Sequence, residues 1–280
     1  MRLELDPVVL VLLALGAGLY VRAIRTLAAR GHRVPAGRQA CWWVGWTLLV
    51  AGLVSPIGAY AEDLLSLHMA EHLLIGDLAA PFLVAGLRSP VLLFYLPRPV
   101  LVALARRHGL RRAFRWIRRP IPALALYVAV LYGWHLAPAF EAAASDPLVH
   151  VLQHQCFLAV NLLIWWVVLE PQRMRFPADL WKVGYVFAAR MASLMMGMLI
   201  VMTRAPIYAD FYGNRPREYG LSPLADQQIG AGLMMVVDVL MIMGTLAYVF
   251  WKAAEEADRQ ESEQQRPAPP AAMSPGPGPA

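Results

Sequence analysis

The chain has 280 residues, of which 59% are hydrophobic and 16% are charged, and its formal net charge is +6. A soluble domain of this length would carry more charge on its surface, so the composition excludes an ordinary soluble globular protein and indicates a polytopic membrane protein. The positive charge does not indicate nucleic-acid binding, because the arginines cluster beside apolar segments, where membrane topology and anionic lipid headgroups account for them.

Seven apolar segments are long enough to cross about 30 Å of hydrocarbon, which takes about 20 helical residues. In chain order they are 7–27, 39–56, 64–87, 120–138, 148–169, 181–203 and 228–252. The sequence therefore predicts an all-α membrane protein whose residues 1–252 form a bundle of seven transmembrane helices. The last segment, 253–280, is rich in Glu, Gln, Pro, Ala and Gly, and this composition predicts a disordered tail.

The loops predict the orientation of the bundle, because short loops rich in arginine stay in the cytoplasm. Arginines fill the first and third connections, within 28–38 and 88–119, whereas the second and fourth connections contain Glu62, Asp63, Glu141 and Asp146. We therefore expect the N-terminus outside and a cytoplasmic C-terminus. The segment 91–119 mixes arginine with aliphatic and aromatic residues, as in an amphipathic segment that lies on the cytoplasmic surface.

Five histidines stand out in these apolar segments. The third begins with "LHMAEHLLIG", in which His68 and His72 are four residues apart and therefore share a helix face. The fifth contains "HVLQHQCF", with His150 and His154 at the same spacing, and the fourth ends in "YGWHLAP" with His135. With the predicted orientation, all five histidines lie at the level of the outer leaflet.

A single histidine near a membrane interface is commonly an amphipathic anchor or a packing residue. Five histidines from three helices at one depth instead predict a shared metal site, because imidazole is the commonest nitrogen ligand and polar groups in lipid need partners. Glu71 lies within a turn of His68 and His72. It is a candidate ligand or an acceptor that orients an imidazole, and a purely structural role is an alternative.

The sixth and seventh segments add further candidate contributors. The outer halves of their helices contain Met198, Met202, Met234 and Met235, and thioether sulfur favours Cu(I), although methionine is also a common apolar filler. Asp226 stands at the start of the seventh segment, where it is expected to cap that helix. Asp238 lies near mid-membrane, where an acid needs a partner and is a functional candidate. No hydrolase, nucleotide or phosphate motif is recognisable, so we expect metal handling rather than catalysis.

Several motifs together resemble the CtaG-related membrane family of cytochrome c oxidase assembly factors (caa-type oxidase). They are "HMAEHLLIGDLAAPFLVAGL" from His68, Trp134–His135 followed by Pro138, "HVLQHQCF" with Trp165, Trp166 and Pro171 downstream, and "DQQIGAGLMM" from Asp226. The resemblance covers about residues 40–250. The sequence departs from the family pattern at Glu71, where Gln is expected, and at Met235, where an aromatic residue is common.

The resemblance implies a multi-pass protein of the cytoplasmic (inner) membrane that binds copper on its outer side and assists copper insertion into a haem-copper oxidase. The implied partners are oxidase subunits, the lipid bilayer, and a copper ion or a periplasmic copper donor. One alternative is a membrane b-type cytochrome, in which paired histidines hold haem. A metal permease is the other, but below the histidines it would have only Asp77, Asn161 and Asp238 as polar groups.

Overall fold

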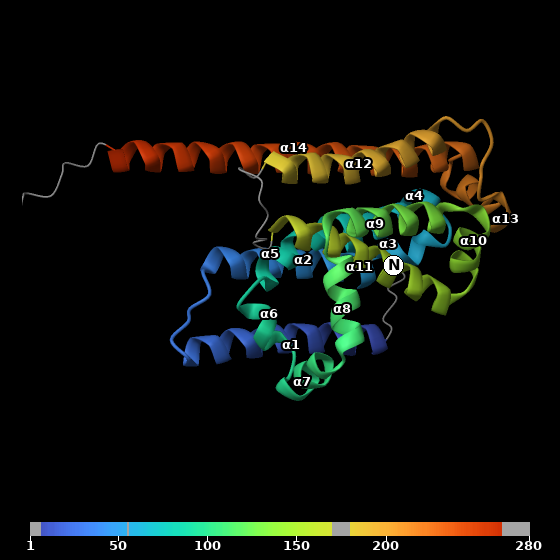
Figure 1. The fold of residues 1–280 in the computed structure, drawn as a ribbon. Helices are drawn as coiled ribbons and strands as arrows, with labels where there is room; N and C mark the ends of the chain where they lie inside the picture. The colour runs from blue at the N-terminus through green and yellow to red at the C-terminus, as the bar shows by residue number, and fades with distance from the viewer. Residues whose placement is uncertain (1–6, 55, 170–179, 265–280) are drawn as a thin grey trace, which may run out of the picture.

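The computed structural model describes residues 7–54, 56–169 and 180–264, which form helices and connecting turns with no strand among them. The all-α prediction is therefore confirmed for this part of the chain. Figure 1 shows the long helices running side by side, with α12 and α14 together along one edge of the bundle and α1 along the opposite edge. The long uninterrupted helices are α1 (Pro7–Ala29), α2 (Ala36–Val54), α9 (Pro120–His135), α11 (Pro147–Leu169), α12 (Leu180–Val201) and α14 (Pro223–Gln264).

The third predicted span is one helical rod made of three pieces. It consists of α4 (Leu65–His72), the π-helical segment η1 (Leu73–Leu78) and α5 (Ala79–Leu87). Backbone hydrogen bonds in a π-helix join residues five apart instead of four. The rod therefore contains a wide turn directly after the second histidine of the pair.

The structure supports several membrane spans but does not reproduce all seven predicted ones. Five helical stretches are long and apolar enough to cross a membrane, and α9 with α10 (Ala137–Ser145), which are bent by 72°, would make six. The remaining predicted span, 39–56, corresponds to the helix α2, which ends at Val54. Residue 55 lies outside the described residues. α2 is not among the candidate spans, because Arg38 and Gln39 in its first turn lower its mean hydropathy and its tryptophans and glycines add little.

The last helix is longer than the sequence predicts. α14 has 42 residues and continues as helix through 253–264, a stretch assigned above to a disordered tail. At about 1.5 Å per residue it is ~63 Å long, about twice the thickness of the hydrocarbon. Residues 265–280 lie outside the described part of the chain, as does Pro171.

Short helices connect the rods. They are α3 (Pro56–Ala61), α6 (Val91–Tyr95), α7 (Arg98–Arg106), α8 (His108–Ile117), α13 (Ala209–Tyr212) and the 3-10 helix η2 (Arg215–Tyr219). α7 and α8 carry much of the arginine of segment 91–119 and bury none of their residues. They lie on the side of the bundle where α1 lies (Figure 1), and α1 is tied to α6 because Arg22 Nη2 donates to the carbonyl oxygens of Phe94 (2.8 Å) and Tyr95 (3.1 Å).

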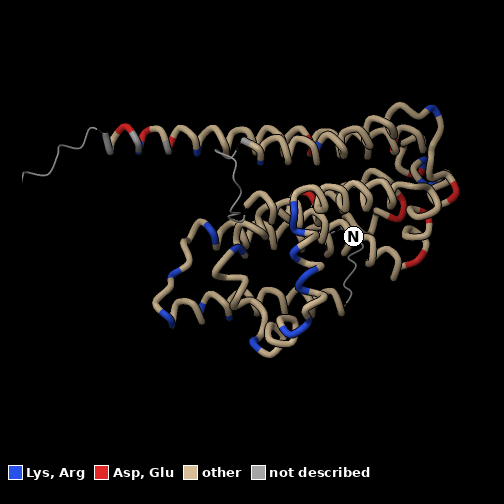
Figure 2. The backbone as a smooth tube through the Cα atoms, viewed as in Figure 1, with Lys and Arg blue, Asp and Glu red and all other residues tan. Residues whose placement is uncertain are grey.

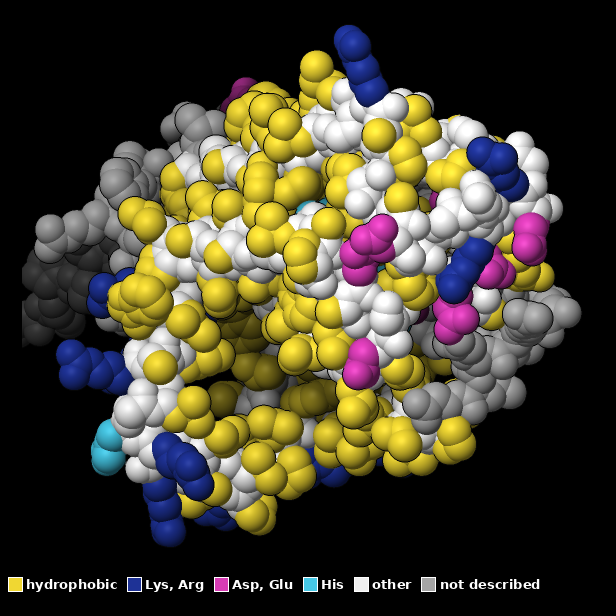
Figure 3. All heavy atoms as spheres, turned by 90° about the vertical axis from the view of Figure 1, so that its right-hand side faces the viewer, with side chains coloured by type: hydrophobic (Ala, Val, Ile, Leu, Met, Phe, Trp, Pro, Cys, Tyr) yellow, Lys and Arg dark blue, Asp and Glu magenta, His cyan; other side chains and the backbone are white. Residues whose placement is uncertain are grey.

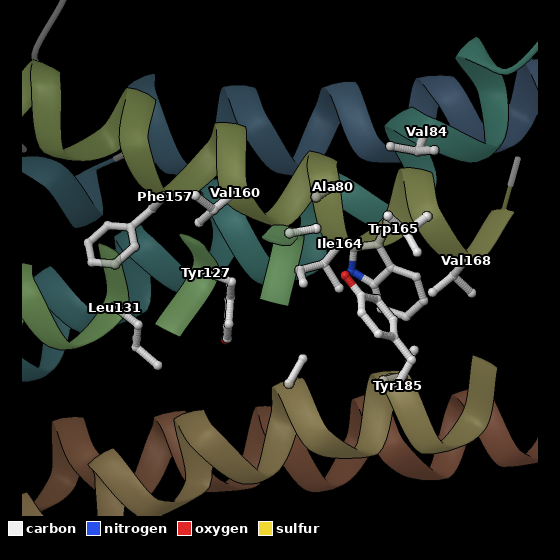
Figure 4. Packing of buried hydrophobic residues seen from close by; sticks show 14 residues of the cluster. Ala80, Val84, Tyr127, Leu131, Phe157, Val160, Ile164, Trp165, Val168 and Tyr185 are labelled. Carbon is white, nitrogen blue, oxygen red and sulfur yellow. The ribbon is translucent and has the colours of Figure 1, made fainter. Parts of the chain in front are cut away.

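Three apolar clusters hold the described rods together, and the third includes Met69, Phe140 and Met234. Figure 4 shows the first, in which Tyr127, Ile164, Trp165 and Tyr185 meet between α9, α11 and α12. The second joins α1 and α2 to α5 and includes Tyr20 and Trp42, whose rings stack with centroids 3.8 Å apart. Small residues let helices approach closely in such bundles. A Cβ atom on Gly45 of α2 would lie 2.8 Å from the backbone nitrogen of Leu83, so α2 and α5 are in direct backbone contact.

Charges are distributed unevenly over the two ends of the bundle (Figure 2). The connection between α1 and α2 is basic, whereas acidic residues gather at the opposite end, around α3, α10 and α13, and at the C-terminal end of α14. Figure 3 faces this acidic end and shows its carboxylates spread among hydrophobic side chains with a few basic ones. The exposed or partly exposed acidic residues there are Glu62, Asp63, Glu141, Asp146, Asp210 and Glu218.

Candidate metal centre

The helix that carries the first histidine pair is capped by another helix. Asp226 of α14 accepts hydrogen bonds from the backbone nitrogens of Leu65 (2.7 Å) and Ser66 (3.2 Å), the first residues of α4, and from the Ser66 hydroxyl. A carboxylate stabilises a helix N-terminus by satisfying free N–H groups and by complementing the helix dipole. We expected Asp226 to cap its own helix; there the Ser222 hydroxyl accepts from the nitrogen of Ala225 at 3.1 Å. Asp226 therefore positions the histidine helix.

The helix of the second pair begins in a similar way. Asp146 Oδ1 accepts from the backbone nitrogens of Leu148 (2.8 Å) and Val149 (3.3 Å) at the start of α11. His150 and His154 follow within the first two turns, as His68 and His72 do in α4. Both pairs therefore lie at the acidic end of the bundle, each on a helix whose first turn is fixed by an aspartate.

Four histidines and one glutamate meet at this end, and we call them the histidine cluster: His68, Glu71, His72, His150 and His154. The Nε2 atoms of His68 and His72 are 2.7 Å apart and share a hydrogen bond. Across the two helices, the ring centroids of His68 and His150 are 4.9 Å apart, and those of His72 and His154 are 4.7 Å apart. The predicted pairing of histidines on one helix face thus brings the two pairs into direct contact.

Two groups within the cluster have the geometry of a cation site. Atoms of His68, His72 and His150 lie within 4.8 Å of one another, and so do atoms of Glu71, His150 and His154. Ligand atoms ~2 Å from a metal lie roughly 3–4 Å from one another, so small side-chain rotations would complete either group. His150 belongs to both groups and can link two arrangements of ligands.

The cluster is buried except on one side. His68, Glu71, His72 and His154 are buried, whereas His150 is partly exposed. Phe140 and Phe157 cover it, with ring centroids 4.9 Å from His68 and 5.0 Å from His72. Three buried nitrogens have no hydrogen-bond partner among the described residues: His72 Nδ1, His150 Nε2 and His154 Nε2, the last 3.6 Å from Glu71 Oε1. Such unsatisfied atoms are rare in folded proteins, and a bound cation would satisfy them.

His135, the fifth predicted ligand, is in neither group. Its Nδ1–H donates to the carbonyl oxygen of Leu131 at 2.7 Å, and its ring lies 6.0 Å from that of Phe157. The Tyr208 hydroxyl donates to the His135 carbonyl oxygen at 2.9 Å. Burial raises the pKa of Tyr208, so this donor stays protonated over the physiological pH range. The end of α9 is therefore held close to the cluster without joining it.

The four predicted methionines separate into three environments. Met198 on α12 and Met202 directly after it are exposed, by 39% and 71%, and the structure does not bring them to the histidines. Met235 packs against Gly197, where its Cγ lies 2.9 Å from the position of an added Cβ. Met234 is buried and lines a cavity together with His72 and His135. Met69, which we did not predict, is buried beside the same cavity.

The predicted mid-membrane acid has a partner. Arg190 of α12, 1% exposed, donates to Asp77 Oδ1, to Asp238 Oδ1 at 3.3 Å and to Asn161 Oδ1 at 3.1 Å. We call these four residues the charge network. The expectation that Asp238 needs a partner is confirmed. Sequence reasoning missed Arg190, although a single arginine in the middle of the sixth apolar segment is a signal in itself.

Comparisons with known proteins agree with the resemblance seen in the sequence. A family model described as "Cytochrome c oxidase caa3 assembly factor (Caa3_CtaG)" matches residues 18–256. Uncharacterized proteins of Mycobacterium bovis and Mycobacterium tuberculosis are each 27% identical over 91% of this chain, and one of Mycobacterium leprae is 25% identical over 88%. The chain spans about two fifths of the length of these relatives, namely 39%, 39% and 40%. No solved structure matches it.

Proposed function

The chain belongs to the cytochrome c oxidase caa3 assembly factor family, and on this premise we propose that it binds copper at the histidine cluster and assists its insertion into a haem-copper oxidase of the cytoplasmic membrane. The family is one of assembly factors and not of catalytic enzymes. Because an assembly factor acts on the oxidase in the membrane, the implied partners are an oxidase subunit and membrane lipid. The observation that carries the proposal is the set of buried, unpartnered imidazole nitrogens from two helices.

The donor atoms of the cluster suit an ion that must be bound and then released. Neutral imidazole binds both oxidation states of copper, and the Glu71 carboxylate compensates part of the charge of the ion. Histidine ligands are not lost to disulfide formation on an oxidising face of a membrane, unlike cysteine thiolates. Because His150 is the partly exposed member and belongs to both ligand groups, we propose that copper is exchanged with the oxidase, or with a periplasmic copper donor, on the His150 side.

The close contact of the rings supports an ion rather than haem. A haem held by two histidines would have its macrocycle between them. The imidazoles of the cluster are instead in contact, with His150 and His154 centroids 4.2 Å apart and a hydrogen bond between His68 and His72. A b-type cytochrome would require these rings to move apart to admit the macrocycle.

Copper analysis of the purified protein tests the proposed site. The full chain, prepared without a histidine tag and loaded with copper, is expected to retain copper after desalting and to show no visible haem bands. His68→Ala combined with His150→Ala should clearly lower the retained copper, because it removes ligands from both groups. His32→Ala with His108→Ala is the matched control, since both residues are exposed and distant in sequence from the cluster. Equal copper in all three proteins, or haem bands in the wild type, would contradict the proposal.

We further propose seven membrane crossings with the N-terminus outside and the histidine cluster at the outer face. α2, with 19 residues, is ~28 Å long and close to the thickness of the hydrocarbon. The connection between α12 and α14 packs onto the turn between α3 and α4, through Arg215 to the Glu62 carbonyl (2.7 Å) and Tyr219 to Asp63 (2.8 Å). This contact supports placing both connections on one side of the membrane. In the proposed topology, one span separates the basic loop after α1 from the connection before α4, and three spans separate the basic loop 88–119 from the connection after α12. Each connection would then lie on the side opposite to the basic loops.

Reporter fusions test this topology. We expect a fusion after Gly31 or Arg107 to report the cytoplasm and a fusion after Gly213 to report the outside, because arginine-rich loops are retained inside. The measurement is the ratio of a reporter active only outside to one active only inside. An outside location for the fusion after Arg107 would contradict the topology. The helices of the two histidine pairs, α4 and α11, would then run in the opposite direction across the membrane, with the histidine cluster at the inner face.

A further inference from the structure

A small cavity lies between the histidine cluster and the charge network. Its volume is about 30 Å³, and its lining includes Met69, His72, Asp77, His135, Phe157 and Met234. A space of this size holds one or two water molecules, or one ion that has lost its hydration shell. An ion in the cavity would therefore have to be bound directly by the surrounding side chains.

His135 faces this cavity in the form that binds a metal. The carbonyl oxygen of Leu131 can only accept a hydrogen bond, so Nδ1 of His135 carries the proton and Nε2 has a free lone pair. Nε2 is buried and has no hydrogen-bond partner among the described residues. Metal-binding histidines commonly donate their other N–H to a backbone carbonyl, which fixes the ring and its tautomer.

The other donors around the cavity are soft. Met69 of α4 and Met234 of α14 are each 4% exposed, so their thioethers are enclosed by protein. Gly230 allows this, because an added Cβ there would lie 3.2 Å from both Ser66 Cα and Met69 Cγ, which brings α14 close to α4. Thioether sulfur and imidazole nitrogen together favour Cu(I) or Ag(I) over hard divalent ions.

We propose that this cavity is a second binding position, distinct from the histidine cluster, in which His135 Nε2 and the thioethers of Met69 and Met234 hold one soft monovalent cation. The inference rests on the proposed function, since it extends copper binding from the cluster to a deeper position. A monovalent ion suits the cavity better than a divalent one, because the cost of removing an ion from water rises steeply with its charge.

His72 connects the two positions. Its Nε2 lies in the cluster, hydrogen-bonded to His68, while its unpartnered Nδ1 belongs to a ring that also lines the cavity. A neutral imidazole has one free lone pair, so His72 can serve either position but not both at once. The cluster retains His68, His150, His154 and Glu71 when His72 binds in the cavity. The cavity is therefore an internal store from which the ion returns to the exchange site.

X-ray absorption of the full chain loaded with Cu(I) under anaerobic conditions tests this position, because the cluster offers only nitrogen and oxygen. The wild type is expected to bind two equivalents and to show sulfur scattering from the metal. Met69→Leu with Met234→Leu keeps the side-chain volume, so folding should persist while sulfur scattering is lost and the stoichiometry falls to one. His135→Ala should also remove one equivalent. Met198→Leu with Met202→Leu is the matched control and should leave both readouts unchanged.

The outcomes separate this inference from the proposed function. A wild type that binds copper through nitrogen and oxygen only, or a Met69→Leu/Met234→Leu protein that keeps its sulfur scattering, overturns the second position and leaves the cluster intact. A triple variant of His68, His150 and His154 to Ala that still binds one equivalent through sulfur supports the second position alone. Failure of the wild type to bind any Cu(I) overturns both.

Discussion

Oxidase isolated from cells that carry His72→Ala or His154→Ala is expected to contain its haem but to lack most of its copper. Each substitution removes a ligand of the histidine cluster, and even loss of a residue that only orients a ligand commonly lowers metal affinity by about 10–100-fold. The spans are held in the membrane by apolar length, to which one imidazole adds little, so the variants should remain inserted. The measurement is copper per haem in the oxidase under copper-limited growth.

Two exposed histidines provide the control for this experiment. His32→Ala and His108→Ala change the same residue type outside the cluster and should leave copper per haem at the wild-type value. The amount of each variant in the membrane must be matched by immunoblot. Fully copper-loaded, active oxidase in both His72→Ala and His154→Ala cells would reduce the cluster to packing residues and leave family membership as the support for the assignment.

The largest loss of stability is expected from Arg190→Met. The guanidinium is buried among Asp77, Asp238 and Asn161, and it lies 5.2 Å from the Tyr127 ring centroid. Methionine would leave the buried Asp238 and the partly buried Asp77 without a counter-charge, and breaking a buried ion pair in this way costs about 3–5 kcal/mol. We expect a lower unfolding temperature in detergent and less protein in the membrane, measured by thermal scanning and by immunoblot.

Removal of the opposing charges should reverse part of this effect. Arg190→Met combined with Asp77→Asn and Asp238→Asn contains no unpaired charge at the network, so its unfolding temperature should lie above that of the single variant. Arg25→Met on α1 is the control, because Arg25 is exposed. If Arg190→Met unfolds at the wild-type temperature, the charge network contributes nothing to stability, and if the triple variant is less stable than Arg190→Met, charge imbalance is not the cause.

The positions of most long helices were predictable from the sequence. The length of an apolar segment can be read from that segment alone, without knowledge of the rest of the fold. Six of the seven predicted spans correspond to candidate spans or to the bent pair α9 and α10. The bend itself was not predicted. It follows His135, where Leu136 leaves the helical conformation and Pro138 lies in the first turn of α10. Proline fits a first helical turn because it lacks the N–H that such a position leaves unpaired.

The candidate site was predictable where it depends on one helix and not where it depends on several. The i, i+4 spacing placed His68 with His72 and His150 with His154, and the structure brings the two pairs together. Depth alone could not show that Phe157 packs against both His72 and His135, or that Asp226 caps a helix more than 150 residues away. Those relations depend on the rotation of each helix about its axis, which periodicity in one segment does not determine.

The π-helical segment after His72 sets how the histidine cluster is rotated about the helix axis relative to the charge network. In a regular α-helix, five residues turn through about 500°, which would leave Asp77 about 140° away from His72 around the axis. The wider turn accommodates one additional residue, so both side chains line the same cavity. Segment 73–78 therefore fixes the rotation of α4 relative to α5 as well as the distance between them. A change of its length by one residue would rotate α4 and its imidazoles by about 100° relative to Asp77 and α5, while each half of the rod would stay intact.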